Sequence, residues 1–176
     1  MRLNLREIIE IPGGSVPFSQ ELDTALLDFP SVRAYTTPIT AEGKVVNTAG
    51  ILTLQGRLHA QMLCVCDRCG AEFPRTVDLD LHADITADAQ DDDPEVFTLD
   101  GDWLDVDEVL STCFILSMDT KCLCKPDCAG LCDRCGANLN LGPCRCQKPR
   151  DPRMAVLEQL LDNKTDEEEE AAHNSD

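Results

Sequence analysis

Hydrophobic and polar residues alternate along two stretches in the middle of the chain. In residues 51–66 the apolar side chains fall at nearly every second position, and the same period returns in residues 73–86 after a break at "DRCGAEFP". A period of two is typical of strands with one buried face and one face in water. Because only a short glycine-containing segment separates the stretches, we predict an antiparallel hairpin of two long strands.

A lone hairpin is marginally stable in water, so the sheet needs further strands. We expect them from "SVRAYTTPI" at residues 31–39 and "EVFTLDGDWLDV" at residues 95–106. Residues 1–31 are weakly patterned, and "LREIIEI" fits either a first strand or a short helix. The predicted fold is therefore β-rich, with an antiparallel sheet or a partly open barrel at its centre.

The hydrophobic period changes from two to that of a helix over residues 105–117. Val106, Val109 and Leu110 lie on one helical stripe, and Asp105 is in position to cap the first turn. We predict that this helix packs on the sheet, which makes the fold class α+β.

Composition divides the chain into four parts. Residues 1–120 form the β-rich domain, and residues 121–150 form a small cysteine-rich zinc module. Residues 151–162 predict a closing helix with a proline in its first turn. Residues 163–176 are an acidic tail that buries nothing and is expected to be disordered.

The overall charge is strongly negative, with 33 acidic against 15 basic residues and a formal net charge of −18. Such a protein is not, as a whole, an electrostatic binder of nucleic acid or of an anionic membrane, and a basic partner suits it better. The N-terminal residues lack the apolar core of a signal peptide, and no apolar run approaches a membrane span. We therefore expect a cytoplasmic protein.

Charge is also segregated along the chain. No lysine or arginine occurs between Thr76 and Thr120, whereas residues 121–153 are predominantly basic. Only this second region could approach phosphate favourably. The candidate RNA or phosphate contacts are Arg134, Arg145, Lys148 and Arg150.

Cysteines are the most unusual feature of the composition, with 11 in the chain. Cytosolic thiols stay reduced, so they indicate metal ligation or redox chemistry rather than disulfides. A tetrahedral zinc site takes four soft ligands, usually in two close pairs, and "CDRCG" at residues 132–136 is a turn that supplies one pair. We expect one structural Zn²⁺ bound by four of Cys124, Cys128, Cys132, Cys135, Cys144 and Cys146.

Two pairings of these six thiols are reasonable, and the sequence does not choose between them. A structural site is favoured over a catalytic one because no histidine or carboxylate stands among the ligands. A redox-active CxxC is disfavoured because "LCDRCGANLN" offers neither a βαβ context nor a helix at its first cysteine.

The same "CDRCG" turn occurs at the tip of the predicted hairpin, with Cys66 and Cys69. Three interpretations of these two thiols stay open. They are ligands of a second metal site completed by Cys113 or Cys122, ligands of a composite site shared with the C-terminal cysteines, or buried residues without a ligand role. We expect Cys64 and Cys113 to be small buried hydrophobic residues.

No pattern of an enzyme active site is found. His59, His82 and His173 fall on polar strand faces or in the tail, where histidines are solvated. The chain has no nucleophile elbow, phosphate-binding loop, HExxH or dinucleotide fingerprint. We therefore predict no catalytic residues, no enzymatic activity and no small-molecule substrate.

The order of these motifs resembles that of the YceD family, described as bacterial large-ribosomal-subunit RNA accumulation proteins with chloroplast relatives. The resemblance rests on "MRLNLREI", "CDRC", "DVDEVLSTCFILSM", "CKPDCAGLCDRCGANLNLGPCRC" and "DPRMAVLEQLL". This chain departs from the family pattern by its additional Cys64, Cys113 and Cys122, and by Asp133 where a proline is common.

The resemblance implies a non-enzymatic role in ribosome biogenesis, in the accumulation or processing of 23S ribosomal RNA and in large-subunit assembly. The implied partner is a pre-50S particle or a basic ribosomal protein, which the acidic residues of 78–108 would suit, with ribosomal RNA contacts through the zinc module. The alternative is a zinc-stabilised interaction module, or a thiol-redox-responsive one, without a ribosomal role.

Overall fold

The structure is a computed structural model that describes residues 1–86 and 96–146. The chain divides into two compact units, Met1–Leu131 and Cys132–Asp176. The helices and strands of the described residues all lie in the first unit. In chain order they are β1 (Arg2–Asn4), α1 (Arg6–Ile9), β2 (Ser15–Leu22), the 3₁₀ helix η1 (Thr24–Leu26), β3 (Val32–Tyr35), β4 (Ile39–Thr48), β5 (Ile51–Val65), β6 (Glu72–Thr86), β7 (Val96–Thr98), β8 (Trp103–Asp105) and α2 (Val106–Ser117).

Six strands form one open sheet in the order β2-β4-β5-β6-β7, with β3 also paired to β5. β4 pairs with β5 as far as His59, and β3 takes over on the same side of β5 at residues 62–64. The strand pairs are antiparallel except for β6 and β7, which run parallel over three residues. The predicted hairpin is confirmed, because β5 and β6 pair in one unbroken register from Leu52–Ile85 to Val65–Glu72.

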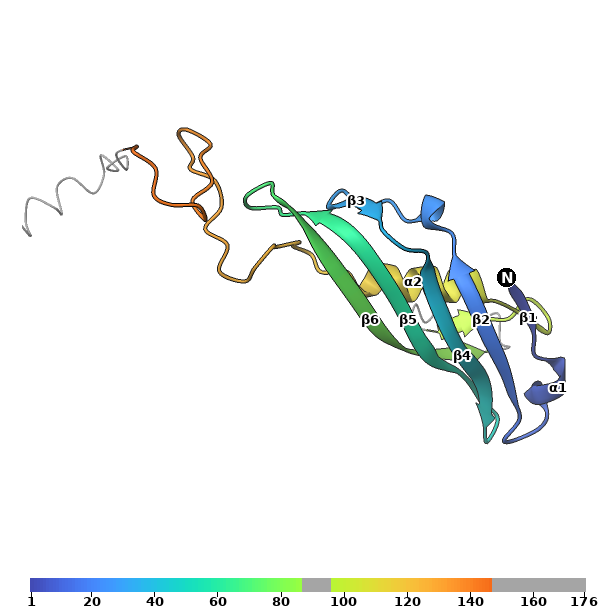
Figure 1. The fold of residues 1–176 in the computed structure, drawn as a ribbon. Helices are drawn as coiled ribbons and strands as arrows, with labels where there is room; N and C mark the ends of the chain where they lie inside the picture. Colours follow the sequence, from blue (N-terminus) through green and yellow to red (C-terminus); the bar gives the residue numbers. More distant parts are fainter. Residues whose placement is uncertain (87–95, 147–176) are drawn as a thin grey trace, which may run out of the picture. The chain divides into compact units, whose positions relative to one another are not determined.

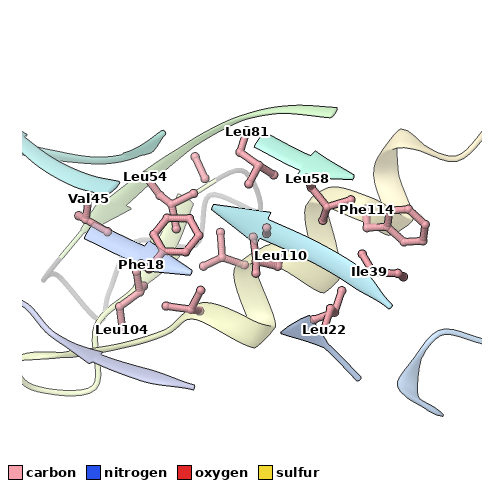
Figure 2. Close-up of a cluster of buried hydrophobic side chains, with 14 of the residues drawn as sticks. Phe18, Leu22, Ile39, Val45, Leu54, Leu58, Leu81, Leu104, Leu110 and Phe114 are labelled. Atoms are coloured by element: carbon pink, nitrogen blue, oxygen red, sulfur yellow. The ribbon is translucent and has the colours of Figure 1, made fainter. Parts of the chain in front are cut away.

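Helix α2 lies across one face of this sheet (Figure 1). Its N-cap is Asp105, whose side chain accepts a hydrogen bond from the backbone N–H of Asp107, as the sequence predicted. The alternating apolar residues of the strands meet the apolar stripe of α2 in a single core. Figure 2 shows Phe18, Leu54 and Phe114 among the side chains that fill it. This core holds the hairpin, and therefore the "CDRCG" turn at its tip, in place.

Two strands of the sheet, β2 and most of β4, lie where the sequence pattern predicted none. Their core-facing positions include polar or small residues, among them Gln20, Gly43 and Asn47, which interrupt the period of two. The Asn47 side chain, which is 1% exposed, donates hydrogen bonds of 2.7 and 2.8 Å to the carbonyls of Ile8 and Ile9. A buried amide is tolerated here because its donors are satisfied by α1.

Gly43 and Gly56 stand directly opposite each other in β4 and β5. A Cβ on Gly43 would lie 2.2 Å from the carbonyl oxygen of Gln55, and one on Gly56 would lie 2.3 Å from that of Glu42. Real Cβ atoms do not approach backbone so closely. The two strands can therefore keep this spacing only because both residues are glycine.

The expected closing helix at 151–162 and the acidic tail at 163–176 lie outside the described residues. Among the residues that are described, no helix is long and apolar enough to cross a membrane.

Candidate metal centre

Eight of the eleven cysteines form two groups of four. The first thiol group comprises Cys66, Cys69, Cys124 and Cys128, and the second thiol group comprises Cys132, Cys135, Cys144 and Cys146. Within each group the four sulfur atoms lie within 4.8 Å of one another. Each group belongs to a different unit of the chain. Either could hold a metal ion.

The sulfur–sulfur distances fit tetrahedral coordination. With zinc–sulfur bonds of about 2.3 Å, two sulfurs of a tetrahedron are about 3.8 Å apart. In the first thiol group Cys66 Sγ lies 3.8 Å from Cys128 Sγ, and Cys69 Sγ lies 3.7 Å from Cys124 Sγ. In the second group one pair of sulfurs is closer, at 3.4 Å. The thiols of the first group are therefore already spaced for a single ion.

Both groups are built on the same turn, because both contain the sequence "CDRCG". Gly70 and Gly136 donate hydrogen bonds of 2.8 and 2.9 Å to the carbonyls of Cys66 and Cys132. The N–H of each first cysteine donates to the carbonyl five residues later, at 2.9 and 2.8 Å. Gly70 and Gly136 have φ values of 66° and 69°, a left-handed conformation that glycine adopts at no steric cost. Each turn presents its two thiols to the same point.

Backbone N–H groups stabilise the thiolate of the first cysteine in each turn. Burial opposes this at Cys66, but hydrogen bonds from the backbone N–H of Cys124 and from those of its own turn lower its pKa to about 6. The N–H groups of the second turn lower the pKa of Cys132 to about 7. Burial and neighbouring thiols raise the pKa of Cys124 to about 12, and the hydrogen bond with Cys135, together with burial, raises that of Cys146 to about 12. The thiols of each group thus differ in how tightly they hold their protons. A bound divalent cation would displace these protons.

Asp67 and Arg68 fasten the first turn to the segment that carries the other two thiols. The N–H of Asp67 donates to the carbonyl of Cys122 at 2.8 Å, and the Asp67 carboxylate accepts from the N–H of Cys122 at 2.6 Å. The Arg68 guanidinium donates to the carbonyl of Cys128 at 3.0 Å. Cys66 and Cys69 are therefore held beside Cys124 and Cys128 by contacts that do not involve sulfur.

The second "CDRCG" turn leaves its arginine exposed. Arg134 occupies the position of Arg68, and within residues 1–86 and 96–146 its side chain makes no hydrogen bond or ion pair. Arg145 is exposed as well. The other two candidate phosphate contacts, Lys148 and Arg150, lie outside the described residues.

Three cysteines belong to neither group. Cys64 is fully buried in the main core, and Cys113 packs against it. Burial raises the pKa of Cys113, and burial together with a hydrogen bond with Cys122 raises that of Cys64 to about 11. Cys122 is also buried, with the Arg75 guanidinium 4.0 Å from its sulfur. Cys113 and Cys122, considered as ligands beside Cys66 and Cys69, are thus not among the grouped thiols.

The sequence left the partners of Cys66 and Cys69 open, and the structure places them with Cys124 and Cys128. The repeated "CDRCG" is the signal that could have indicated two groups, because each copy supplies two ligands and needs two more. Which close pair joins which copy depends on the path of the chain after α2. That path is a tertiary property that ligand spacing does not encode.

Comparison with known proteins identifies the family. The family model described as Large ribosomal RNA subunit accumulation protein YceD matches residues 54–161. The match spans more than half of the 176 residues and includes both thiol groups. The chain belongs to the YceD family. The resemblance found in the sequence is thereby confirmed.

Curated relatives of this YceD-family chain come from plants and mycobacteria. "Large ribosomal RNA subunit accumulation protein YCED homolog 1, chloroplastic" of Zea mays is 25% identical over 148 residues, which are 65% of this chain and 50% of the relative. Uncharacterized proteins of Mycobacterium bovis and Mycobacterium tuberculosis are 27% identical over 122 residues, 66% of this chain and 58% of theirs. The chain spans about half the length of these relatives. No solved structure matches it.

The acidic residues of this YceD-family chain have several local roles. Asp78 and Asp80 project from β6 with side chains 78% and 87% exposed. Asp80 forms an ion pair of 3.1 Å with Arg57 of β5. Asp100 and Asp102 form ion pairs of 3.2 and 3.9 Å with arginines of the N-terminal segment, and Asp105 caps α2. The acidic residues of 78–108 were expected to contact a basic partner. Part of their negative charge is instead engaged in contacts within the fold.

Proposed function

We propose that this protein is a non-enzymatic, cytoplasmic factor in the biogenesis of the large ribosomal subunit, supporting the accumulation and processing of its 23S RNA. Membership of the YceD family carries the proposal, together with the name of the Zea mays relative. The net charge of −18 adds a constraint, because it opposes general attraction to RNA. Contact with a precursor particle must then be local or must pass through a basic protein.

The ion proposed for both thiol groups is Zn²⁺, in a structural role. Four sulfurs without nitrogen or oxygen donors select a soft ion, zinc or iron. Four thiolates also complete a tetrahedral shell, which leaves no open position for a substrate. The segments that carry the thiols contain little regular structure, so an ion would supply much of their order.

Metal analysis of protein produced with both zinc and iron supplied tests this assignment. We expect two equivalents of zinc per chain, because there are two complete groups of four thiols. Cys128→Ser should remove one equivalent and Cys144→Ser the other, whereas Cys113→Ala should remove none. Iron with visible charge-transfer absorbance, or two equivalents retained by Cys128→Ser, would contradict the assignment.

The proposed partner is the pre-50S particle, approached by two kinds of surface. The exposed Arg134 and Arg145 suit contacts to ribosomal RNA phosphates, to which Lys148 and Arg150 would add. The exposed acidic side chains of β6 suit a basic ribosomal protein. Neither surface requires catalysis.

Co-sedimentation of the full chain with immature large subunits tests the ribosomal role. We expect association at low salt, and we expect Arg134→Glu combined with Arg145→Glu to weaken it and to reduce its salt dependence, because phosphate contacts release counterions. Arg6→Glu combined with Arg33→Glu is the matched control, since these arginines are 81% and 70% exposed and change the net charge equally. A chain that never sediments with precursor particles would favour the alternative, an interaction module without a ribosomal role.

The proposal that the protein is not an enzyme is supported by the exposure of a hollow on the sheet. This hollow, of about 420 Å³, lies on the open face of the sheet and includes His59, Asp78 and Arg57. His59 Nδ1 is 2.6 Å from Asp78, and its Nε2 is 3.1 Å from the Gln61 amide. Both ring nitrogens are thus occupied by exposed neighbours, in a site that does not exclude water.

A further inference from the structure

Strand β6 has one edge that is unpaired over most of its length. It pairs with β5 along its whole length on one side, but with β7 only at residues 84–86 on the other. Figure 1 shows β6 as the outer strand of the sheet over the remainder. An unpaired edge exposes a row of backbone donors and acceptors that another chain can use.

The register shows which backbone groups point outward. The N–H of Cys66 donates to the carbonyl of Ala71, so this pair is hydrogen-bonded. Such pairs recur at every second residue of an antiparallel ladder, and the β5–β6 register is unbroken. The odd-numbered residues of β6 therefore bond to β5, and the even-numbered residues direct their N–H and C=O groups to the outer edge.

The neighbours of this edge agree with that alternation. Thr86 accepts a hydrogen bond of 3.0 Å from Leu99 on the β7 side, and Pro74, which has no N–H, occupies an outward position. Between them lie four outward-facing residues whose backbone groups have no backbone partner within residues 1–86 and 96–146. These residues are Thr76, Asp78, Asp80 and His82.

The core-facing side chains of β6 are incompletely covered along the same stretch. Val77 and Leu79 are half-buried, whereas their partners in β5, Ala60 and Leu58, are 0% and 1% exposed. The apolar surface of the core thus reaches the edge of the sheet and ends there uncovered. A further strand beside β6 would bury it.

The side chains on the solvent-exposed face of β6 determine which strand would fit. Asp78 and Asp80 are largely exposed, and their contacts, His59 and Arg57, lie on β5, away from the free edge. A strand with lysine or arginine on this face would gain cross-strand ion pairs. A second copy of this chain would instead place acidic residues opposite acidic residues, and two molecules of net charge −18 repel each other.

We propose that the β6 edge, residues 76–82, binds an extended lysine- or arginine-rich segment of a partner protein as an additional strand. The segment would alternate basic residues, which face Asp78 and Asp80, with apolar residues, which pack on Val77 and Leu79. At about 3.4 Å per residue, the edge accommodates roughly seven residues, or about 24 Å. This inference rests on the geometry of the edge and holds whether or not the partner is ribosomal.

Hydrogen exchange of the zinc-loaded full chain, followed residue by residue by NMR, tests the proposal. The probe is a nine-residue capped peptide that alternates lysine with valine. At saturating peptide, the backbone amides of Thr76, Asp78, Asp80 and His82 should exchange at least about tenfold more slowly than in the free chain, because each amide acquires a backbone partner. Amides of β2, at the other side of the sheet, should not change.

A peptide of the same composition with its lysines gathered at one end is the matched probe. It has the same charge but cannot pair its lysines and valines with the two faces at once, so it should bind more weakly. Asp78→Lys combined with Asp80→Lys should weaken the alternating peptide about tenfold. Glu7→Lys combined with Glu10→Lys changes the net charge equally at exposed positions of α1 and its C-cap, and should weaken it much less.

Three results would overturn the proposal. The two peptides could protect the four amides equally, which would reduce the effect to charge alone. Protection could appear elsewhere in the chain. The unliganded chain could form a dimer protected at these same amides, which would make a second copy the occupant. Because no ribosomal component takes part, each of these results leaves the ribosomal role to its own test.

Discussion

At the level of single residues, the two "CDRCG" turns share a backbone but use their aspartates differently. The Asp67 carboxylate accepts a hydrogen bond of 2.6 Å from the N–H of Cys122, a residue that is 2% exposed. Asp133, at the same place in the second turn, is exposed, and among the described residues its carboxylate accepts a hydrogen bond only from the thiol of Cys132, at 3.7 Å. A hydrogen bond from a buried N–H to a carboxylate stabilises a fold more than a hydrogen bond made in water.

Replacing Asp67 by alanine should therefore lower the free energy of unfolding by about 1–2 kcal/mol, because the N–H of Cys122 loses its acceptor. Asp133→Ala is the matched control and should cost less than about 0.5 kcal/mol. Urea unfolding of the zinc-loaded variants measures both. Equal losses would mean that the contact between Asp67 and Cys122 adds nothing to the stability of the first turn.

At the level of elements, the glycine pair in β4 and β5 is the most constrained point of the sheet. Gly43→Ala would bring its Cβ to 2.2 Å from the carbonyl oxygen of Gln55, so the strands must separate. We expect a loss of about 2 kcal/mol, since the strain of overpacking exceeds the entropic gain of replacing glycine. Lys44→Ala, at the exposed neighbouring position, should change the stability by less than about 0.5 kcal/mol. Thermal unfolding that ranks the two variants equally would contradict the close approach.

The elements that the sequence predicted are those whose patterning is uninterrupted. β5, β6 and α2 have long runs of a single period, and their bounds were predicted to within a residue or two. β2 and β4 were missed because Gln20, Gly43 and Asn47 occupy core-facing positions. Each of these has a tertiary explanation, such as the hydrogen bond of 3.0 Å from Gln20 to Asp107. A single sequence does not display such partners.

At the level of the whole molecule, the candidate thiols could be predicted from the sequence, and the way they group could not. All eight grouped cysteines were candidates from spacing alone. Cys69 and Cys124 are 55 residues apart, however, and meet only because α2 returns the chain to the tip of the hairpin. The exposed Arg134 and the docked Arg68 show the same limit, since identical local sequences acquire different partners from the surrounding fold.

The position of the first thiol group also fixes an order of events during synthesis. Two of its sulfurs belong to the tip of the hairpin, and the other two follow α2, so a chain growing from its N-terminus cannot offer all four until Cys128 has emerged. By then every strand of the sheet and α2 have already been made. An ion can therefore be held by all four thiols only after the residues of the sheet and of α2 have been synthesised, and its uptake would report that the nascent chain has been extended past Cys128.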